Sequence, residues 1–453
     1  MRVMEQYKKA FTSLPEEIKE AEVNGETHDA VTVFVTEEGI QNVQVSKEQA
    51  LYIRVSGEKT GYYYTQNLEE DPTKALQTAY ENSLYSEQTV PEIMRKEAGE
   101  TICEEIEAIQ EVSILERRAL SLLTEIKEQM MLDTDQIQLQ ASLKAETYGQ
   151  HTVNSHGLDN AFTHPIYLLD VMAAVRTGEK IITSDVAVAA TCLEELDAKK
   201  AGDELNLKCK AQLLPEITVE SGEYPVILSN SVVYYLFGTG WQLFSGSKYV
   251  EGTTKLDGML GQKLGADCLT ICDKTSLAGK GFPMHFDCEG NAGKDVFLLE
   301  QGVCKNLLHN QISAHALSAE VTGNAGRRPL LFGNIATDIL VTPKNFCIMP
   351  GKNDLDTMIK TMDNGILITE SFDIFHTIDI SSGDFSVPCW GIQIENGKEK
   401  GGILSMVMTG NILDLFSNVE EVGNHFMVHP MVAIENYGIG TCPLQLKKMT
   451  ISG

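Results

Sequence analysis

The sequence predicts an α+β fold, in which a mixed α/β N-terminal domain is followed by a β-rich C-terminal domain. Two observations predict this class. Short runs rich in Val, Tyr and Thr, separated by glycine or charged turns, recur along the chain. Runs with helical periodicity lie mainly in the first half. Because 453 residues exceed the usual size of a single hydrophobic core, we expect two domains, at residues 1–215 and 216–453.

The N-terminal domain is expected to combine a β-meander with several helices. Asp71 and Pro72 favour a helix start, because proline fits the first helical turn. Ser113 and Glu116 have the spacing of a capping box ahead of an apolar helical face. In chain order we expect a helix-compatible segment over 1–25, strands over 30–39, 40–46, 50–57 and 59–66, a helix over 71–85, an irregular connection over 87–112, a helix over 113–131, strands over 137–157, 166–175 and 182–190, and a helix over 193–213.

The C-terminal domain opens with a buried-strand pattern at 221–229 and an apolar, helix-compatible run at 231–244. From Val250 onward glycines divide the chain into short pieces, which favours strands and tight turns. The later elements that we expect are strands within 346–351, 365–373, 377–397 and 401–410, a short helix over 411–419, and a last strand over 432–440.

Composition excludes some partners. The formal net charge is −28, from 36 Lys and Arg against 64 Asp and Glu, and Lys199–Lys200 and Lys447–Lys448 are too few to form a basic patch. Because DNA binding requires a basic surface and the net charge is strongly negative, we expect no direct nucleic-acid partner. No apolar run approaches the ~20 residues that span a bilayer, and the first 20 residues are too charged for a signal peptide, so we expect a cytoplasmic protein. The ten cysteines contain no CxxC pair and are expected to be buried thiols.

The stretch from Met284 to Arg328 is the most idiosyncratic part of the sequence. Glycine and asparagine tolerate positive φ, so both ends of this stretch can turn sharply and present backbone N–H groups outward. Arg327 and Arg328 follow at once. The stretch consists of EGNAG at 289–293, a strand-like run at 296–300, a turn at 301–302, a helix-compatible run at 307–319 and TGNAG at 322–326.

Four segments of the chain resemble the TldD/PmbA family of peptide-processing proteins, which were once described as modulators of DNA gyrase. Within the family the chain is more similar to the TldE/PmbA branch than to the zinc-bearing TldD branch, and the resemblance is strongest over 284–423. The four segments are FDCEG (286–290), LLEQGV (298–303), TGNAGR (322–327) and PKNFCIMPG (343–351).

The resemblance implies where a zinc site would lie. In the TldD branch two histidines of a helical HExxxH motif ligate zinc, the glutamate activates the metal-bound water, and a later cysteine completes the site. Aligned on this motif, Leu236 and Trp241 replace the histidines and Phe237 replaces the glutamate, and no HExxH or HExxxH occurs elsewhere in the chain. We therefore expect no metal and no cofactor in this chain, and a helix that is packed in the core.

Other candidate residues have two interpretations each. His425 and His429 have a metal-ligand spacing and would share one face of a strand, or they form a structural pair. Cys442 stands like the ligand cysteine of the zinc branch, but without histidine partners we interpret it as an ordinary thiol. Arg327 is expected to contact a carboxylate or to form an internal salt bridge. Ser382 and Asp384, in SSGDFS, form a binding turn or a solvated hairpin.

The first functional hypothesis is a non-catalytic subunit of a two-component zinc metallopeptidase. The resemblance implies a zinc-bearing, TldD-like partner that encloses a chamber for unfolded peptides together with this chain. The second hypothesis is a homodimer that binds peptides without proteolysis, and the third is an active hydrolase built on His425 and His429. The residues that we expect to contact peptide are Asn291, Gly323, Asn324, Arg327, Ser382 and Asp384.

Overall fold

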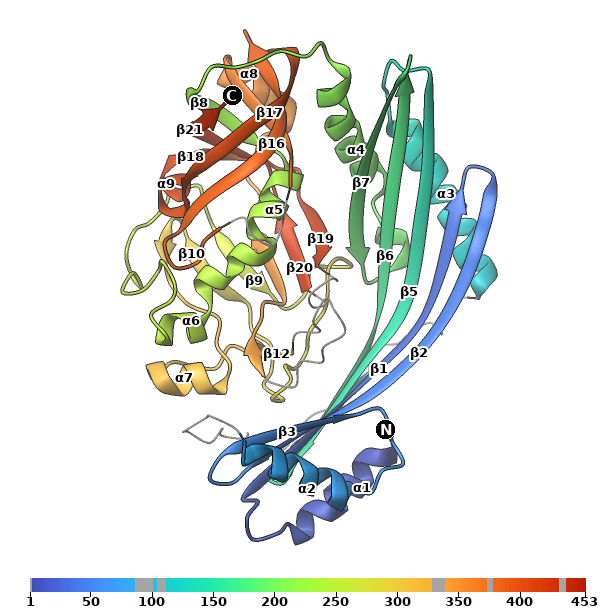
Figure 1. Ribbon diagram of the computed structural model, residues 1–453, viewed down its shortest axis with the longest axis vertical. Coiled ribbons are helices and arrows are strands. Elements are labelled where there is room, and N and C mark those ends of the chain that lie inside the picture. The colour runs from blue at the N-terminus through green and yellow to red at the C-terminus, as the bar shows by residue number, and fades with distance from the viewer. Residues whose placement is uncertain (1, 86–100, 104–110, 328–338, 373–377, 432–436) are drawn as a thin grey trace.

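The computed structural model describes residues 2–85, 101–103, 111–327, 339–372, 378–431 and 437–453 (Figure 1). Within these residues it contains three large β-sheets with helices packed against them, which confirms the predicted α+β class. The first sheet is built from residues 20–190 and the other two from residues 222–452. A boundary between residues 215 and 216 stays a prediction, although it falls in the stretch that joins the two sets of strands.

The first sheet is a long, curved blade that runs along one side of the molecule (Figure 1). Its order is β3-β2-β1-β5-β6-β4, and β7 also pairs with β6. Alternating buried and exposed positions along β5 and β6 give one face to the core. The strands are β1 (Glu20–Thr36), β2 (Gly39–Ser56), β3 (Thr60–Thr65), β4 (Thr101–Cys103), β5 (Gln136–Asn154), β6 (Asp159–Thr177) and β7 (Lys180–Ala190).

Four helices cover this sheet. α1 (Arg2–Ala10) and α2 (Pro72–Ser83) pack at the end of the blade where β3 lies, and α3 (Val112–Gln129) packs on β1 and β5 (Figure 1). α4 (Ala198–Leu213) contacts both α3 and β7 and also reaches the strands of the second half. The helix predicted at 71–85 is confirmed as α2. Asp71 caps it by accepting a hydrogen bond from the backbone N–H of Thr73.

The second sheet has six strands in the order β11-β10-β9-β14-β20-β19. All neighbours are antiparallel except β14 and β20, which run parallel. Its strands are β9 (Ile271–Lys274), β10 (Val296–Glu300), β11 (Val303–Cys304), β14 (Asn345–Ile348), β19 (Met427–Met431) and β20 (Tyr437–Thr441).

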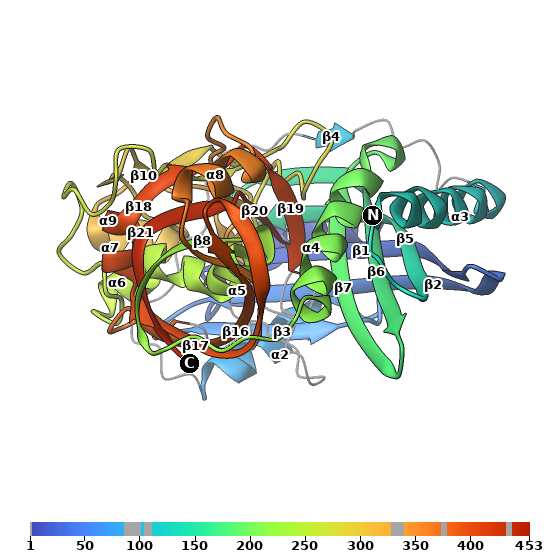
Figure 2. The same cartoon turned by 90° about the horizontal axis from the view of Figure 1, so that it is seen from above.

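The third sheet has the order β17-β16-β15-β8-β21-β18, and β17 also pairs with β21, so five of its strands close into a ring that is visible from above (Figure 2). Ring closure removes the free edges that an open sheet would present. Its strands are β8 (Gly222–Leu228), β15 (Gly365–Ser371), β16 (Asp384–Glu395), β17 (Lys398–Asn411), β18 (Val419–Val422) and β21 (Leu444–Ser452).

Helix α5 (Asn230–Gly240) lies between the second and third sheets, because it packs against both β20 and β15. Its residues belong to the largest apolar cluster of the described chain. The remaining elements are the helices α6 (Gly246–Val250), α7 (Gln311–Leu317), α8 (Leu355–Met362) and α9 (Ile412–Asn418), the short strands β12 (Ala325–Gly326) and β13 (Leu340–Val341), and short 3-10 turns after α1, before α4 and after α5.

The structure corrects three local predictions. The first helix ends at Ala10 instead of continuing to residue 25, because Asn24 and Gly25 pair within β1. Helix α3 begins after Glu111 without a side-chain cap, so the predicted capping box does not form. The last strand is β21 rather than the run at 432–440, whose first part lies outside the described residues together with most of the predicted connection at 87–112. No helix in the described ranges combines the length and apolarity needed to cross a bilayer.

Candidate functional site

The side chains at the predicted metal-motif positions form part of the core. Leu236, Phe237 and Trp241 are each at most 2% exposed. The ring of Phe237 packs between Phe346 and Phe416, with centroid distances of 5.6 and 6.2 Å. The indole Nε1 of Trp241 donates a hydrogen bond of 3.0 Å to a tyrosine hydroxyl, so its one polar atom is used within the core. Since this set offers no free ligand atom, these positions do not fit a zinc ion.

The other metal candidates do not assemble either. His425 precedes β19 while His429 lies within it, so the prediction that both share one strand face is wrong. The ring of His429 is buried and stacks on Tyr234 at 4.8 Å. Cys442 is buried, its thiol donates to the carbonyl of Ile348 at 3.7 Å, and burial raises its pKa to about 12. Across the described residues, no three His, Cys, Asp or Glu side chains gather as a metal site.

The two glycine–asparagine segments meet around a buried carboxylate. One oxygen of Asp287 accepts the backbone N–H groups of Glu289 (3.0 Å) and Asn291 (2.8 Å), and the other accepts that of Ala325 (3.1 Å). Burial raises the pKa of Asp287 above its ordinary value despite these hydrogen bonds. Gly323 has φ of +69°, and a Cβ there would stand 2.5 Å from the carbonyl oxygen of Ala292. The two segments at the ends of this stretch are therefore joined, and glycine allows their backbones to approach.

A buried ion pair holds the second segment in place. Lys344 donates from Nζ to Asp273 at 3.0 Å, and both side chains are fully buried. Asn324 donates to Asp273 (2.7 Å) and to the carbonyl of Thr342 (2.8 Å), and it accepts from Lys344 (2.9 Å). The amide of Asn324 is thus engaged inside the protein.

Three other predicted contact residues also lie in local networks. The side chain of Asn291 is half-buried and contacts Asp287 at 3.4 Å. The backbone N–H of Ser382 donates to Asp379 at 2.9 Å, and the carboxylate of Asp384 accepts from Asn411 at 2.8 Å. Ser382 and Asp384 thus belong to the turn that leads into β16.

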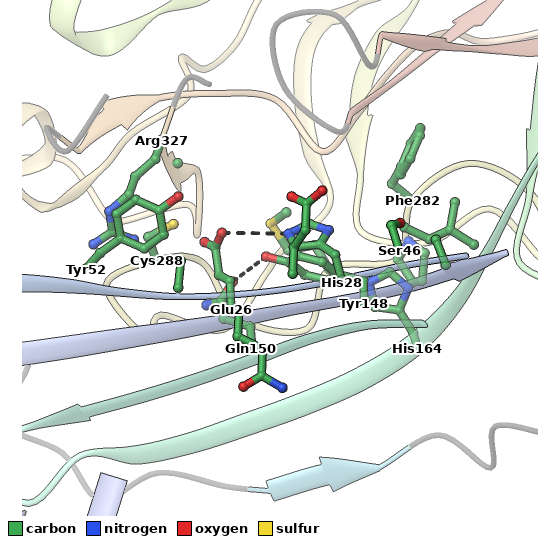
Figure 3. Close-up of a pocket in the computed structure, with 18 of the residues that line it drawn as sticks. Glu26, His28, Ser46, Tyr52, Tyr148, Gln150, His164, Phe282, Cys288 and Arg327 are labelled. Atoms are coloured by element: carbon green, nitrogen blue, oxygen red, sulfur yellow. Dashed lines mark hydrogen bonds and ion pairs between the residues drawn. The ribbon is translucent and has the colours of Figure 1, made fainter. Parts of the chain in front are cut away.

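A cleft with a volume of about 300 Å³ lies between the first sheet and the loops of the second half. Figure 3 shows Arg327, Tyr52 and Cys288 at one end, and Phe282 and His164 at the other. One wall consists of side chains of β1, β2, β3, β5 and β6, namely Glu26, His28, Ala30, Ser46, Glu48, Gln49, Ala50, Tyr52, Tyr64, Lys144, Tyr148, Gln150, His164 and Ile166, with Gln66 just beyond β3. The other wall consists of Phe282, Pro283, Met284, Cys288, Ala325, Gly326 and Arg327.

Arg327 is the one predicted contact residue that lines this cleft. It is 6% exposed, and its guanidinium carbon lies 4.7 Å from the ring centre of Tyr52. Its Nε and Nη1 atoms are buried without a hydrogen-bond partner, and no salt bridge to it forms in the part of the chain that the structure describes. The predicted alternative of an internal salt bridge is therefore not seen among these residues. Arg328 lies outside them.

A charged cluster occupies the middle of the cleft. His28 Nδ1 lies 2.6 Å from Glu146 Oε1, and Lys144 also pairs with Glu146. Burial lowers the pKa of His28, but hydrogen bonds to Glu146 and Glu26 outweigh this effect and raise it to about 9. Burial likewise opposes ionisation of Glu146, but His28 and Lys144 hold its pKa at about 2. Both members of the pair are therefore charged at neutral pH.

This pair makes stability depend on pH in a defined direction. His28 has an ordinary pKa of 6.5 and a folded pKa of about 9, so its contribution is complete below pH 6.5 and is lost as pH rises through 9. Glu146 contributes fully above pH 4.5 and loses its contribution as pH falls through 2. We expect His28→Gln to lower the free energy of unfolding by on the order of 1–2 kcal/mol near pH 6 and by less at pH 10. Urea denaturation of both proteins at the two pH values measures this, and a difference that is constant with pH would contradict it.

Sequence reasoning found Arg327 but missed the first-sheet wall of the cleft. His28, Tyr52 and Tyr148 are ordinary strand residues in the sequence, and no motif marks them. Only the register of β1 against β2 and β5 brings them together, since His28 pairs with Tyr148 and Asn24 with Tyr52. The available signals were the aromatic run YYYT at 62–65 and the isolated His28, and neither of them indicates a site by itself.

Comparisons with known proteins agree with this architecture. The family model described as the PmbA/TldA metallopeptidase C-terminal domain matches residues 221–453. The structure is similar to that of TldE from Thermococcus kodakarensis, with a TM-score of 0.83 at 20% identity over 100% of both chains. That likeness shows the shared fold.

Curated relatives give the same result. A metalloprotease TldD homolog of Buchnera aphidicola is 27% identical over 263 residues, which cover 55% of this chain and 50% of the relative. The chain thus spans about half the length of this relative. A metalloprotease PmbA homolog of Haemophilus influenzae is 23% identical over 428 residues, covering 91% of this chain and 88% of the relative. With the family model matching just over half of its residues, this chain belongs to the TldD/PmbA metallopeptidase family.

Proposed function

We propose that the chain is a non-catalytic subunit of a two-component zinc metallopeptidase that processes unfolded peptides, and that a TldD-like partner supplies the zinc site. The observation that carries this proposal is the environment of α5. By the resemblance, Leu236, Phe237 and Trp241 align with the two ligands and the general base of the TldD motif, and their side chains are buried among core residues. A helix in this state contributes packing where the TldD branch is expected to hold metal.

The role left for this chain is to hold peptide. The cleft combines apolar side chains such as Phe282, Pro283 and Met284 with polar groups such as Gln150 and Arg327. Pockets that bind ligands generally have this composition, because apolar area supplies affinity and a few polar groups fix orientation. A cytoplasmic location would be consistent with this activity and is part of the proposal.

The test uses the chain alone, a TldD-like protein alone, and the two together. We expect the chain alone to cleave no unfolded peptide and to bind no zinc above background, and the mixture to cleave in a chelator-sensitive way and to co-elute as a heterodimer. The control replaces the glutamate of the partner's HExxxH motif by glutamine, which should retain the heterodimer and abolish cleavage. Chelator-sensitive cleavage by the chain alone, with stoichiometric zinc, would refute the proposal.

A second candidate function is peptide binding by a homodimer without proteolysis. One observation favours it, namely that this chain supplies both walls of the cleft, which would allow it to bind peptide without a partner. Light scattering separates the candidates. A stable homodimer that binds peptides, and that neither associates with a TldD-like protein nor gains activity from it, would support the second candidate.

A further inference from the structure

The described chain has four buried cationic side chains, and one of them lacks an anionic partner. Arg54 pairs with Glu22 and Glu289, Lys344 with Asp273, and Lys208 with Glu370 at 3.2 Å. Arg327 is buried to the same degree, yet none of the salt bridges within the described residues includes it.

The acidic side chains that act most strongly on Arg327 already interact with other residues. Glu22 accepts from Arg54 at 2.8 Å, and Glu26 lies 4.0 Å from the ring of His28. Glu22 and Glu26 act on Arg327 through space, without a contact. Tyr52 offers the face of its ring, which attracts a cation but accepts no strong hydrogen bond. Cys288 lines the same end of the cleft.

An unpaired, buried guanidinium is unfavourable, because the charge has lost water and gained no anion. Planar guanidinium groups bind carboxylates through charge-assisted hydrogen bonds, and they are the usual choice where a carboxylate must be recognised. The arginine ends a cleft whose opposite end holds Phe282, with Ser46 and His164 nearby (Figure 3). Its place in the cleft suits the charged group of a ligand whose remainder is apolar.

The cleft contains other charged groups besides Arg327. Lys144 and His28 face three carboxylates, because Glu26 and Glu48 line the cleft and Glu146, just outside the lining, pairs with both cations, so the groups other than Arg327 carry no excess of positive charge. A ligand anion would therefore not be drawn in by a general positive field, and its recognition would depend on a direct contact with Arg327.

We propose that Arg327 is a carboxylate-binding subsite, which receives a carboxylate of a short peptide segment while the apolar wall at residues 282–284 receives the adjoining side chains. The peptide nature of the ligand rests on the proposed function, whereas the anion subsite rests on the geometry. The carboxylate has two sources, the C-terminus of the peptide or an acidic side chain, and the subsite chemistry is the same for both.

The experiment uses the purified full chain without any partner. Isothermal titration compares an N-acetylated Leu-Ala-Leu-Ala tetrapeptide bearing a free C-terminal carboxylate with its C-terminal amide. A second pair of amidated peptides carries Glu or Gln at the second position. We expect the carboxylate form of at least one pair to bind about 10-fold or more tightly than its neutral counterpart. The pair that shows the difference identifies the source of the carboxylate.

Variants separate a binding role from a structural one. Arg327→Gln is expected to remove the difference within the pair, to leave the affinity for the amide unchanged, and to keep or raise the melting temperature, because an uncompensated charge is removed. The matched control is Arg176→Gln, the same substitution at an exposed arginine outside the cleft, which should change none of these values. The parent should also melt at a higher temperature with the favoured peptide, and Arg327→Gln should not.

Three results would overturn the subsite. They are equal binding of carboxylate and amide forms, an Arg327→Gln variant that retains the discrimination, and inorganic phosphate binding through Arg327 where neither peptide binds. Because the titration contains no partner protein, its result does not depend on the result of the heterodimer test. If the chain binds the carboxylate peptide more tightly than its neutral counterpart but the two-component assay shows no cleavage, the subsite is supported and the proposed function is refuted.

Discussion

Replacing Glu289 by glutamine is expected to lower the free energy of unfolding by about 3–5 kcal/mol, because it breaks a buried ion network from one side. Arg54 donates to Glu22 at 2.8 Å and to Glu289 at 3.3 Å, and all three side chains are at most 1% exposed. The second oxygen of Glu289 accepts the backbone N–H of Gln311, at the start of α7, at 2.9 Å. Glutamine has one oxygen and one NH₂ group, so in either orientation a donor faces Arg54 or Gln311.

The matched control is Glu223→Gln, which removes the same charge from a pair with Lys448. That pair has a length of 2.8 Å, and its side chains are 59% and 55% exposed. Exposed pairs of this kind contribute little, so we expect a change within about 0.5 kcal/mol. Urea denaturation of the two variants and the parent supplies the comparison. Equal effects of the two substitutions would mean that the network does not hold β2 to the loop at 287–293.

Restoring the HExxxH motif in α5, through Leu236→His, Phe237→Glu and Trp241→His, is expected to unfold the protein. Removing a buried phenylalanine costs about 3–5 kcal/mol, and burying a carboxylate in its place adds to this. Trp241→His further leaves a cavity and removes the hydrogen bond to Tyr437. These losses together approach or exceed the 5–15 kcal/mol by which a typical domain is stable.

The control for this prediction is Phe237→Leu, which keeps the site apolar and is expected to cost about 1–2 kcal/mol while the fold persists. Near-UV circular dichroism and thermal unfolding report on both variants, and zinc is measured in whatever folded protein is recovered. A triple variant that folds cooperatively and binds one zinc per chain would refute the view that α5 is committed to the core. It would also show that the metal site can be regained by changing three side chains.

Regular elements were predictable where burial alternates along a strand or follows one face of a helix. The strands predicted at 30–39 and 137–157 and the helix predicted at 113–131 follow such patterns. The structure has β1 (Glu20–Thr36), β5 (Gln136–Asn154) and α3 (Val112–Gln129) there. Within α3 the predicted face is buried at Leu115, Leu122 and Ile126, whereas Ile114 is 37% exposed. Local periodicity sets these faces, so the sequence alone is sufficient to predict them.

The site was less predictable, because it depends on tertiary pairing. A buried asparagine such as Asn324 and a ligand-binding asparagine have the same local sequence, and only the positions of Asp273 and Lys344 decide between them. The absence of a salt bridge to Arg327 among the described residues likewise reflects how Glu22 is engaged by Arg54 of β2 and Glu26 by His28 of the same strand. This part of the cleft could not be predicted because the residues that form it lie far apart in the sequence.

The closed ring of the third sheet has a consequence for biosynthesis. Residues 222–228 of β8 pair with residues 366–368 on one side and with residues 444–451 on the other. At ~5–20 residues per second, the ribosome needs on the order of 10–40 s after making β8 before the last of these partners exists. Both edges of β8 are open until residues 366–368 have been made, and one edge stays open until residues 444–451 exist, so β8 is a template for pairing with other chains. Shielding by a chaperone in that interval would therefore be expected to raise the yield of correctly assembled protein.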